Sequence, residues 1–529
     1  MRSKTFLLLS ALPLLLPACQ SSTPVVPRTL TWAEPPWPNP PSDLLEKARW
    51  EYSVDGGKTY APAVASTVKK DRTLRLTGRA RFDYDHAEDV RALLLTCPVP
   101  RKFSGSAKLN AQSLKGPMKD MRYRSIPNIS PGLLRPAGNE MTVSFEVASP
   151  VSAPNTFTPT PPVILLALEA EHLRFVSGPV LGSFDDKTFS VTCRTNLSAD
   201  VAVCRRAGGG EEVVLARGGD VGLIHRLQAP IPARSDDRAQ YFVRARLGRT
   251  TIRQPIVPPA PVGRTLRFVA LGDSRTQPWF WAAVADAAAR HNPQLVIHTG
   301  DMVSSGKEEN AWEPEFFAPA AGLLASTPLY PVIGNHEGKA QLYNELFHTP
   351  TPDGRGRNWH QTIGPVLLIG IEGTQDWSAE SENIQWLESV LAGSKAKFTF
   401  LVTHYPPASS SKHGRVESDG QLREKTMRHA REVIVPLLER AGATAVIAGH
   451  DHCYERSETP GGLTLVTTGG GGAPLYPQIK DPAAQNPWTR VFHKGYHYCL
   501  FEADSERCVL TVFDLDGKVL DARTWTTDR

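Results

Sequence analysis

Apolar runs and helical segments alternate through the last half of the chain, from Arg264 to its end. Three continuously apolar runs, typical of strands covered on both faces, are "LRFVALGD", "QLVIHTGD" and "TAVIAGHDH". The segments between them predict helices, among them "PWFWAAVADAAARHN", "IQWLESVLAGS" and "EVIVPLLERAGA", and Pro278 suits a first helical turn. This alternation predicts an α/β layered domain over residues 264–529.

Upstream of that domain, apolar and polar residues alternate with a period of two. "TLRLTGRARFDY" and "EMTVSFEV" predict strands of a β-sandwich domain over residues 42–167. "HLRFVSGPVLGSFDDKTFSVTCRTN" predicts further short strands over residues 168–257, in an immunoglobulin- or fibronectin-like sandwich. Residues 42–167 carry no catalytic constellation and are faintly similar to the sandwich modules of glycoside hydrolases. For them we expect a spacer role, or contact with a glycan or cell surface.

The first 19 residues have a pattern of their own. Arg2 and Lys4 precede an apolar stretch from Phe6 to Leu16, which is too short to span a bilayer and suits a secretory signal. The stretch runs into "LPAC", which resembles the lipobox of bacterial lipoproteins and implies a lipid on the sulfur of Cys19. We expect export and membrane attachment in the periplasm or at the cell surface; an ordinary signal peptide is the alternative. Residues 20–41 are rich in proline and predict an extended tether.

Composition narrows the choice of partners. Hydrophobic residues make up 41% of the chain and charged residues 21%, which is ordinary for a globular protein. The formal net charge of +5 is small for 529 residues and gives no case for a nucleic-acid-binding surface. Export would place the later cysteines in an oxidising compartment. Cys193 and Cys204 flank one predicted hairpin, and Cys499 and Cys508 flank another, so each pair is a candidate disulfide with the connectivity open.

Polar residues of one chemical kind follow five apolar runs of the α/β domain. Ligands of open α/β sheets bind just beyond the carboxyl ends of the strands, so one edge is expected to collect these side chains. They are, in chain order, Asp273, Asp301, Asn335, His404, His450 and His452. Mixed oxygen and nitrogen donors suit zinc, iron and manganese, and the lack of a thiolate argues against a closed structural zinc site.

The spacing of His450 and His452 predicts two ions rather than one. Side chains alternate along an extended chain, so residues two apart face the same way and each imidazole can meet its own ion. Two ions roughly 3.5–4 Å apart form the clamp used for phosphoryl displacement. One ion needs fewer ligands than the strand ends supply, whereas two ions that share a carboxylate use them all.

Taken together, "GD" at Asp301, "GNHE" at 334–337 and "GHDH" at 449–452, with Asp273 and His404, resemble the signature of calcineurin-like metallophosphoesterases. With the preceding sandwich, the chain is most similar to the purple acid phosphatase branch over residues 168–529. The resemblance implies a four-layer α/β fold, in which a sandwich of two β-sheets is flanked by helices. It also implies hydrolysis of phosphate esters by a hydroxide held on two metal ions.

The resemblance further implies a role for each residue. One ion would be held by Asp273, Asp301 and His452, and the other by Asp301, Asn335, His404 and His450, with Asp301 bridging. His336 is not a ligand in the family. It would lie near the phosphate, where it can donate a hydrogen bond to a phosphate oxygen or protonate the leaving alcohol.

Two positions depart from the family pattern. The tyrosine that ligates iron three residues after the bridging aspartate is replaced by Ser304, so we expect a colourless protein with undetermined metals. Relatives outside the purple branch have a histidine two residues after the first aspartate, where this chain has Arg275. A guanidinium keeps its proton and cannot ligate a cation. We expect Arg275 to clamp a substrate phosphate with paired hydrogen bonds.

Three functions remain open at this point. A phosphomonoesterase is the first; a phosphodiesterase acting on nucleotides or lipid head groups is the second. The third is a surface lipoprotein that binds a glycan or a partner and has lost catalysis. The glycine-rich stretch 467–474 either cradles a phosphate or serves the backbone alone. We expect Trp279, Phe280 and Trp281 to lie in the core. The histidines outside the motifs are expected to be structural or exposed: His298, His413, His429, His493 and His497.

Overall fold

The structure is a computed structural model of the 529-residue chain. It describes residues 41–65, 73–96, 106–114, 125–148, 156–157, 163–207, 210–218, 222–232, 239–338, 341–350 and 357–527. The predicted signal segment, its Cys19, nearly all of the predicted tether, and Cys97 lie outside the described residues. Among the helices of the described part, none is both long and apolar enough to cross a membrane.

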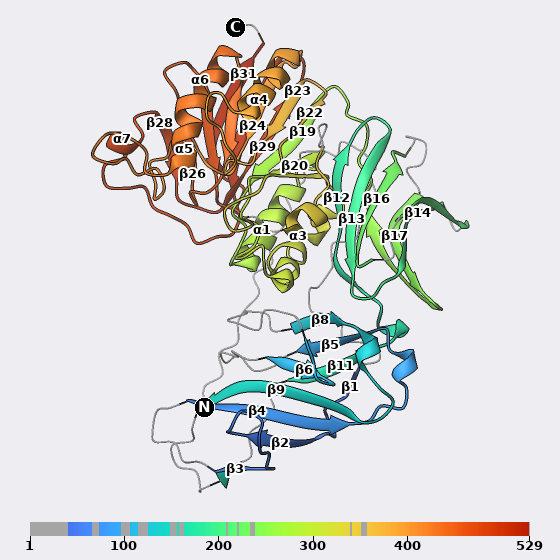
Figure 1. Cartoon of the computed structure of the whole chain (residues 1–529). Helices are drawn as coiled ribbons and strands as arrows, with labels where there is room; N and C mark the ends of the chain where they lie inside the picture. The colour runs from blue at the N-terminus through green and yellow to red at the C-terminus, as the bar shows by residue number, and fades with distance from the viewer. Residues whose placement is uncertain are drawn as a thin grey trace, which may run out of the picture.

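The N-terminal region is all-β, as the period-two patterns predict (Figure 1). One sheet has the order β1 (Ser42–Asp43), β11 (Ile164–Leu168), β5 (Ala92–Thr96) and β8 (Ser125–Ile129). A second has the order β2 (Arg49–Ser53), β4 (Thr73–Phe82), β9 (Asn139–Ala148), β6 (Ala107–Leu109) and β7 (Gln112–Ser113), and β3 (Val64–Ala65) pairs with β10 (Thr156–Phe157). Alternate residues of the two larger sheets, such as Leu76, Met141 and Leu165, meet in one buried cluster.

A second β-sandwich follows and lies against the α/β domain (Figure 1). Its sheets have the orders β12 (Phe175–Phe184), β13 (Thr188–Thr195), β16 (Ile224–Pro230) and β15 (Glu212–Arg217), β14 (Asp200–Ala207), β17 (Ala239–Leu247), β18 (Thr250–Ile256). Cys193 on β13 and Cys204 on β14 belong to different sheets, so the predicted hairpin between them is wrong. The segment between them instead crosses from one sheet to the other.

The α/β domain is built on two sheets. The first has the order β21 (Leu329–Pro331), β20 (Leu295–His298), β19 (Leu266–Leu271), β29 (His497–Ala503), β30 (Arg507–Asp514), β31 (Val519–Thr526). The second has the order β22 (Trp359–Ile363), β23 (Val366–Gly370), β24 (Phe398–Val402), β25 (Ala445–Ala448), β27 (Thr464–Thr468), β26 (Tyr454–Glu458), β28 (Thr489–His493). The strands β19 to β21 pair in parallel, as do β23, β24, β25 and β27.

The two sheets pack face to face with helices outside them, which gives the expected four layers. Phe268 of β19 meets Phe400 of β24 edge to face between the sheets, with ring centroids 5.7 Å apart. The next residue of each strand points outward: Val269 shares a buried cluster with Trp281 of α1, and Leu401 shares one with the helices on the other side. This period-two division explains why the strands are apolar throughout. The parallel strands of both sheets direct their carboxyl ends toward one edge of the domain.

The helices flank the sheets as follows: α1 (Pro278–Ala289), α2 (Ala321–Leu324) and α3 (Gln341–Leu346) accompany the first sheet, and α4 (Glu382–Gly393), α5 (Lys425–His429) and α6 (Val435–Arg440) the second; α7 (Pro482–Gln485) follows later. Two π-helical segments, Glu313–Phe317 and Ala430–Ile434, interrupt this set. Pro278 begins α1, as predicted. Trp281 is buried, but Trp279 is 65% exposed, so the prediction that it lies in the core is wrong.

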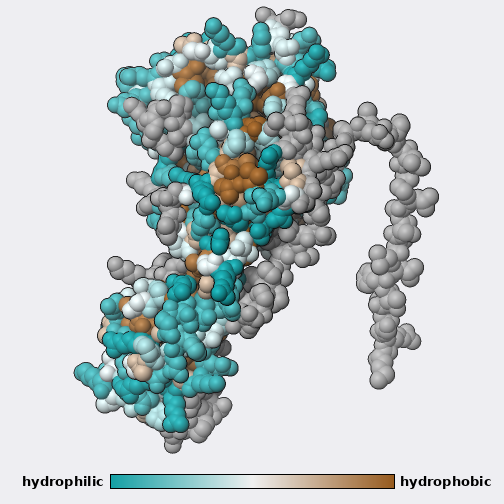
Figure 2. All heavy atoms as spheres, turned by 90° about the vertical axis from the view of Figure 1, so that its right-hand side faces the viewer, coloured by the Kyte–Doolittle hydropathy of each residue, from teal (hydrophilic) through white to brown (hydrophobic). Residues whose placement is uncertain are grey.

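The described cysteines are free and buried. Cys499 and Cys508 do lie on paired antiparallel strands, β29 and β30, which confirms the second hairpin; their direct partners across it are Val512 and Ala503. On the face shown in Figure 2, hydrophobic residues form separate patches among hydrophilic ones. The most prominent of these patches lies near the middle of the view.

Candidate metal centre

The six predicted donor residues follow strands of both sheets and meet at one edge. Asp273 follows β19, Asp301 follows β20, and His450 follows β25, and all three adopt left-handed backbone conformations with φ of 56°, 57° and 71°. Such angles are uncommon for residues other than glycine, and they collect at functional sites, where the surrounding structure enforces them. Each strand therefore ends in a sharp turn that aims a polar side chain over the sheet edge.

The turn after β25 differs from what the sequence suggests. The strand ends at Ala448, so His450 and His452 lie beyond it, in a bent segment. The extended-chain argument for why the two imidazoles face the same way is therefore wrong. The left-handed conformation of His450 separates their directions: its Nδ1 faces His404, whereas the Nε2 of His452 faces Asp273.

Four donor atoms converge on the position predicted for the second ion. The Nε2 atom of His404 lies 3.0 Å from Asn335 Oδ1, 3.2 Å from His450 Nδ1 and 3.4 Å from Asp301 Oδ1. Donors that sit about 2.0–2.2 Å from one ion are separated by roughly these distances in a tetrahedral site. The arrangement fits a metal ion bound by two imidazoles, an amide oxygen and a carboxylate.

The protons of these imidazoles are used elsewhere. His404 donates from Nδ1 to the carbonyl oxygen of Thr299 at 2.8 Å, and His450 donates from Nε2 to Glu424 at 2.9 Å. Burial lowers the pKa of His404 to about 4, so its Nε2 carries no proton near neutral pH. With His450 donating from Nε2, nitrogen and oxygen lone pairs face one another across the cluster. A bound cation would stabilise this arrangement.

Asp273 and His452, two of the three donors predicted for the first ion, lie close together. Asp273 Oδ1 is buried without any hydrogen-bond partner, and it lies 3.5 Å from His452 Nε2. His452 donates from Nδ1 to the carbonyl oxygen of Pro474 at 2.6 Å, and burial lowers its pKa to about 3, so its Nε2 is bare. Burial, reinforced by the Asp301 carboxylate, raises the pKa of Asp273. An orphaned buried carboxylate oxygen opposite a bare imidazole nitrogen fits a metal ion here too.

Asp301 lies between the two positions. Its Oδ1 faces His404 and accepts a hydrogen bond from the backbone N–H of His336 at 3.0 Å. Its Oδ2 faces the other way, 3.3 Å from Arg275 Nε and 3.7 Å from His336 Nε2. The position of Asp301 is therefore the one that a bridging carboxylate would need.

His336 lies at the open side of this cluster. It donates from Nδ1 to the carbonyl oxygen of Ser304 at 2.7 Å, which turns Nε2 toward Asp301. Its side chain is 29% exposed, whereas those of His404 and Asp301 are almost fully buried. His336 can thus reach a group that enters from solvent, and it is outside the set of four donors of the second position.

Glu337 is a functional residue that the sequence reasoning missed. Its buried carboxylate accepts hydrogen bonds from the backbone N–H groups of Asp301, Met302 and Gly334 at 2.8–2.9 Å, and from Val303 at 3.3 Å. One side chain thus holds together the turns that carry Asp301 and Asn335. The sequence did offer one signal for Glu337, because it is the last residue of the "GNHE" motif.

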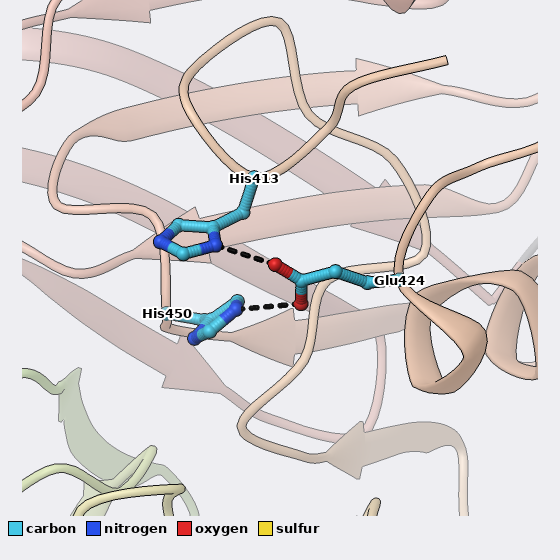
Figure 3. A group of neighbouring side chains, drawn as sticks. All are labelled: His413, Glu424 and His450. Atoms are coloured by element: carbon cyan, nitrogen blue, oxygen red, sulfur yellow. Dashed lines mark hydrogen bonds and ion pairs between the residues drawn. The ribbon is translucent and has the colours of Figure 1, made fainter. Parts of the chain in front are cut away.

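A second missed group lies behind His450 (Figure 3). The Glu424 carboxylate lies between two imidazoles, 2.9 Å from His450 Nε2 and 2.5 Å from His413 Nδ1. Burial acts to raise the pKa of Glu424, but the hydrogen bonds from His413 and His450 outweigh it and hold that pKa well below its usual range. A carboxylate behind a metal-binding imidazole fixes its orientation and raises its basicity.

The loop that carries His413 is tied to the motif itself. The backbone N–H of His413 donates to the buried Asp451 carboxylate at 3.1 Å. His413 was expected to be structural or exposed; the structure instead places it against Glu424, with its ring 4.0 Å from that of His450. Nothing in the local sequence of residues 405–425 marks this contact. Of the other non-motif histidines, His298 and His497 are buried and hydrogen-bonded to hydroxyls of Ser274 and Thr468.

The glycine-rich stretch 467–474 packs against the turn that carries Asp273. The N–H groups of Gly471 and Ala473 donate to the carbonyl oxygens of Gly272 and Asp273 at 2.8 and 2.7 Å. A Cβ on Gly469 would come within 2.2 Å of the backbone of Asp451, so only glycine fits there. These two N–H groups are used within the protein, which favours the backbone role for this part of the stretch.

Comparisons with known proteins agree with this geometry. The family model for calcineurin-like phosphoesterases matches residues 266–454. The chain is 24% identical over 292 residues to the Arabidopsis thaliana protein named "Probable inactive purple acid phosphatase 9", an alignment spanning 45% of this chain but only 44% of that protein. It is 26% identical over 312 residues to tartrate-resistant acid phosphatase type 5 of Rattus norvegicus, spanning 48% of this chain and 89% of that protein.

The fold has a counterpart among solved structures. Purple acid phosphatase PPD1 from yellow lupin (Lupinus luteus) seeds matches with a TM-score of 0.60 at 16% identity, over 88% of this chain and 95% of that chain. The expected α/β architecture with preceding β sandwiches is therefore confirmed. The match covers more of the chain than residues 168–529 provide, so the likeness of fold extends into the N-terminal β region.

Proposed function

We propose that this chain, whose residues 266–454 are a calcineurin-like phosphoesterase domain with purple acid phosphatase homologues, hydrolyses phosphate monoesters at a centre of two metal ions. The domain match and the homologues support a phosphoester hydrolase. Zinc, iron or manganese suit the donor set. When bound, two such ions polarise a phosphoryl group and make water a stronger nucleophile near neutral pH.

One observation carries the proposal. Asn335 Oδ1, His450 Nδ1 and Asp301 Oδ1 all face His404 Nε2, at 3.0, 3.2 and 3.4 Å. Beside them, the buried Asp273 Oδ1 has no hydrogen-bond partner. The protein maintains this repulsive arrangement with hydrogen bonds from outside the cluster. Such preorganisation is expected of a metal site.

Asp301 and His336 would do the work that belongs to the chain itself. Asp301, whose two oxygens face opposite ways, would hold both ions. His336, held by Ser304 through Nδ1, presents Nε2 on the open side. There, in its protonated form, it donates to a phosphate oxygen or gives its proton to the leaving alcohol.

Replacing His336 with alanine is expected to lower turnover by about 10²–10⁴-fold, the usual contribution of a positioned acid. Both metal ions should remain bound, because the donors of the two positions are untouched. Turnover and metal content, measured on the same preparation, check this expectation. His429→Ala, a histidine of α5 outside the cluster, is the matched control and should leave both unchanged. Loss of metal from His336→Ala would contradict the role assigned to His336.

The choice between a monoesterase and a diesterase is decided by a parallel assay. Metal-loaded protein is given 4-nitrophenyl phosphate and bis(4-nitrophenyl) phosphate, and the ratio of kcat/KM is compared. A ratio favouring the monoester supports the proposal; a ratio favouring the diester makes the chain a phosphodiesterase. Fewer than one ion per chain after reconstitution, with no turnover of either compound, would favour a binding lipoprotein.

With Ser304 in place of the tyrosine, we expect the iron-loaded protein to be colourless.

We also propose that the chain is exported and held at a membrane by a lipid on Cys19, because "LPAC" follows the apolar stretch. The β domain over residues 42–167 would then lie between the tether and the metal centre, where contact with a glycan or cell surface is feasible. Recovery of the protein in the membrane fraction, and its release by Cys19→Ser, would support this placement.

A further inference from the structure

The first metal position has a fixed positive charge beside it. Arg275 donates from Nε to Asp301 Oδ2 at 3.3 Å, and its Nη2 lies 3.5 Å from His452 Nε2. Two of the three donors of that position therefore face a guanidinium. Its charge cannot be removed by deprotonation in the working pH range. The side chain is only 15% exposed, so water screens this charge poorly.

The surroundings of Arg275 hold it in place. Its Nη1 donates to the hydroxyl of Thr276 at 3.1 Å, and that hydroxyl lies 3.4 Å from the hydroxyl of Ser304. The backbone N–H of Arg275 also donates to the carbonyl oxygen of Asp301 at 3.3 Å. Arg275 is thus linked to Ser304 through the hydroxyl of Thr276.

Arg275 has not taken over the role of the ion. A guanidinium that replaced the metal would pair with Asp273, yet Asp273 Oδ1 has no hydrogen-bond partner. The guanidinium reaches Asp301 and His452 but leaves Asp273 Oδ1 without a partner. Arg275 therefore competes with a metal ion for Asp301 and His452, whereas Asp273 Oδ1 remains available to bind the ion.

The second position has the opposite electrostatic surroundings. Glu424, a carboxylate, accepts a hydrogen bond from His450, and the Thr299 carbonyl oxygen accepts one from His404. Negative charge and dipoles behind the imidazoles strengthen them as ligands. The charged group nearest the ligands is thus a carboxylate at the second position and a guanidinium at the first, so Arg275 weakens the attraction of a cation to the first position.

We propose that Arg275 makes the first metal position the weaker one and couples its filling to a bound phosphate group. The inference rests on the proposed two-metal function. A phosphate dianion offers a guanidinium paired hydrogen bonds that are stronger than the long contact with Asp301. Drawn toward that anion, Arg275 releases Asp301 Oδ2 and His452 Nε2 to the ion. By linkage, the ion then tightens phosphate binding by the same factor.

The test measures metal binding directly. The metal-free full chain is titrated with Zn²⁺ by equilibrium dialysis, with and without inorganic phosphate, and bound zinc is counted by mass spectrometry. We expect one tight ion and a second ion bound at least 10-fold more weakly, with phosphate narrowing the difference. In Arg275→Ala the weak ion should bind at least 10-fold more tightly, and phosphate should tighten it by a smaller factor than in wild type. Arg264→Ala, an exposed arginine preceding β19, is the matched control and should behave as wild type.

Further variants identify which ion is which. His450→Ala should remove the tight ion and leave the weak one, whereas Asp273→Asn should remove the weak ion alone. Equal affinities in the wild type, or an unchanged weak ion in Arg275→Ala, would overturn the inference about Arg275. If two equal ions bind and phosphate monoesters are hydrolysed, the proposed function stands while the role of Arg275 falls. If no second ion binds at any phosphate concentration, in wild type or Arg275→Ala, both fall together.

Discussion

Replacing His450 with alanine is expected to remove the tight metal ion and to lower phosphoesterase turnover by more than about 100-fold. Loss of a residue that only supports a metal ligand typically lowers activity by about 10–100-fold. The effect here should be larger, because the ligand itself is lost. His450 Nδ1 is one of the four bare donors around the second position, and His404 Nε2 lies 3.2 Å away from it. Metal content and kcat on one preparation provide the measurement.

Glu424→Gln gives a graded companion to that variant. The amide keeps the shape of the carboxylate but loses the charge that supports His450 and His413. Zinc affinity at the second position should fall by about 10–100-fold while the ligand set stays complete. Full zinc affinity in His450→Ala would show that the four-donor site is not the metal site, and unchanged affinity in Glu424→Gln would show that the carboxylate is only structural.

Replacing Glu337 with alanine is expected to lower the free energy of unfolding of the protein by about 4 kcal/mol or more, because each of four stranded buried donors costs about 1–3 kcal/mol. The variant leaves the buried N–H groups of Gly334, Asp301, Met302 and Val303 without their acceptor. Metal binding should fall as well, since the strained turn at Asp301 loses its support. Chemical denaturation of the metal-free protein measures the first effect.

Two variants bracket that result. Glu337→Gln retains one acceptor oxygen and should lose only part of the stability. Glu388→Ala removes an exposed glutamate of α4, and its effect should stay within about 0.5 kcal/mol. A loss below about 1 kcal/mol in Glu337→Ala would mean that water or another group satisfies these N–H donors.

Local pattern was enough to predict the framework of the α/β domain. Continuous apolar runs predicted strands covered on both faces, and β19, β20, β24 and β25 are buried along nearly their whole length. The order of polar residues after those runs was also readable, because parallel strands direct their carboxyl ends to one edge. The sequence pattern was less informative for the second sandwich. Cys193 and Cys204 flank a short segment between two strands, and such a segment looks the same whether it closes a hairpin or crosses between sheets.

The sequence by itself determined which chemical groups gather at the edge, because strand ends and residue types are local properties. Only the tertiary structure decided how each group is used. Glu424 comes to lie behind His450 although 26 residues separate them, and His413 is aimed by Asp451 from another loop. The conformation of His450 and the place of Arg275 against Asp301 likewise depend on long-range packing. Hydrogen bonds and charges act through space, so no local pattern in the chain encodes them.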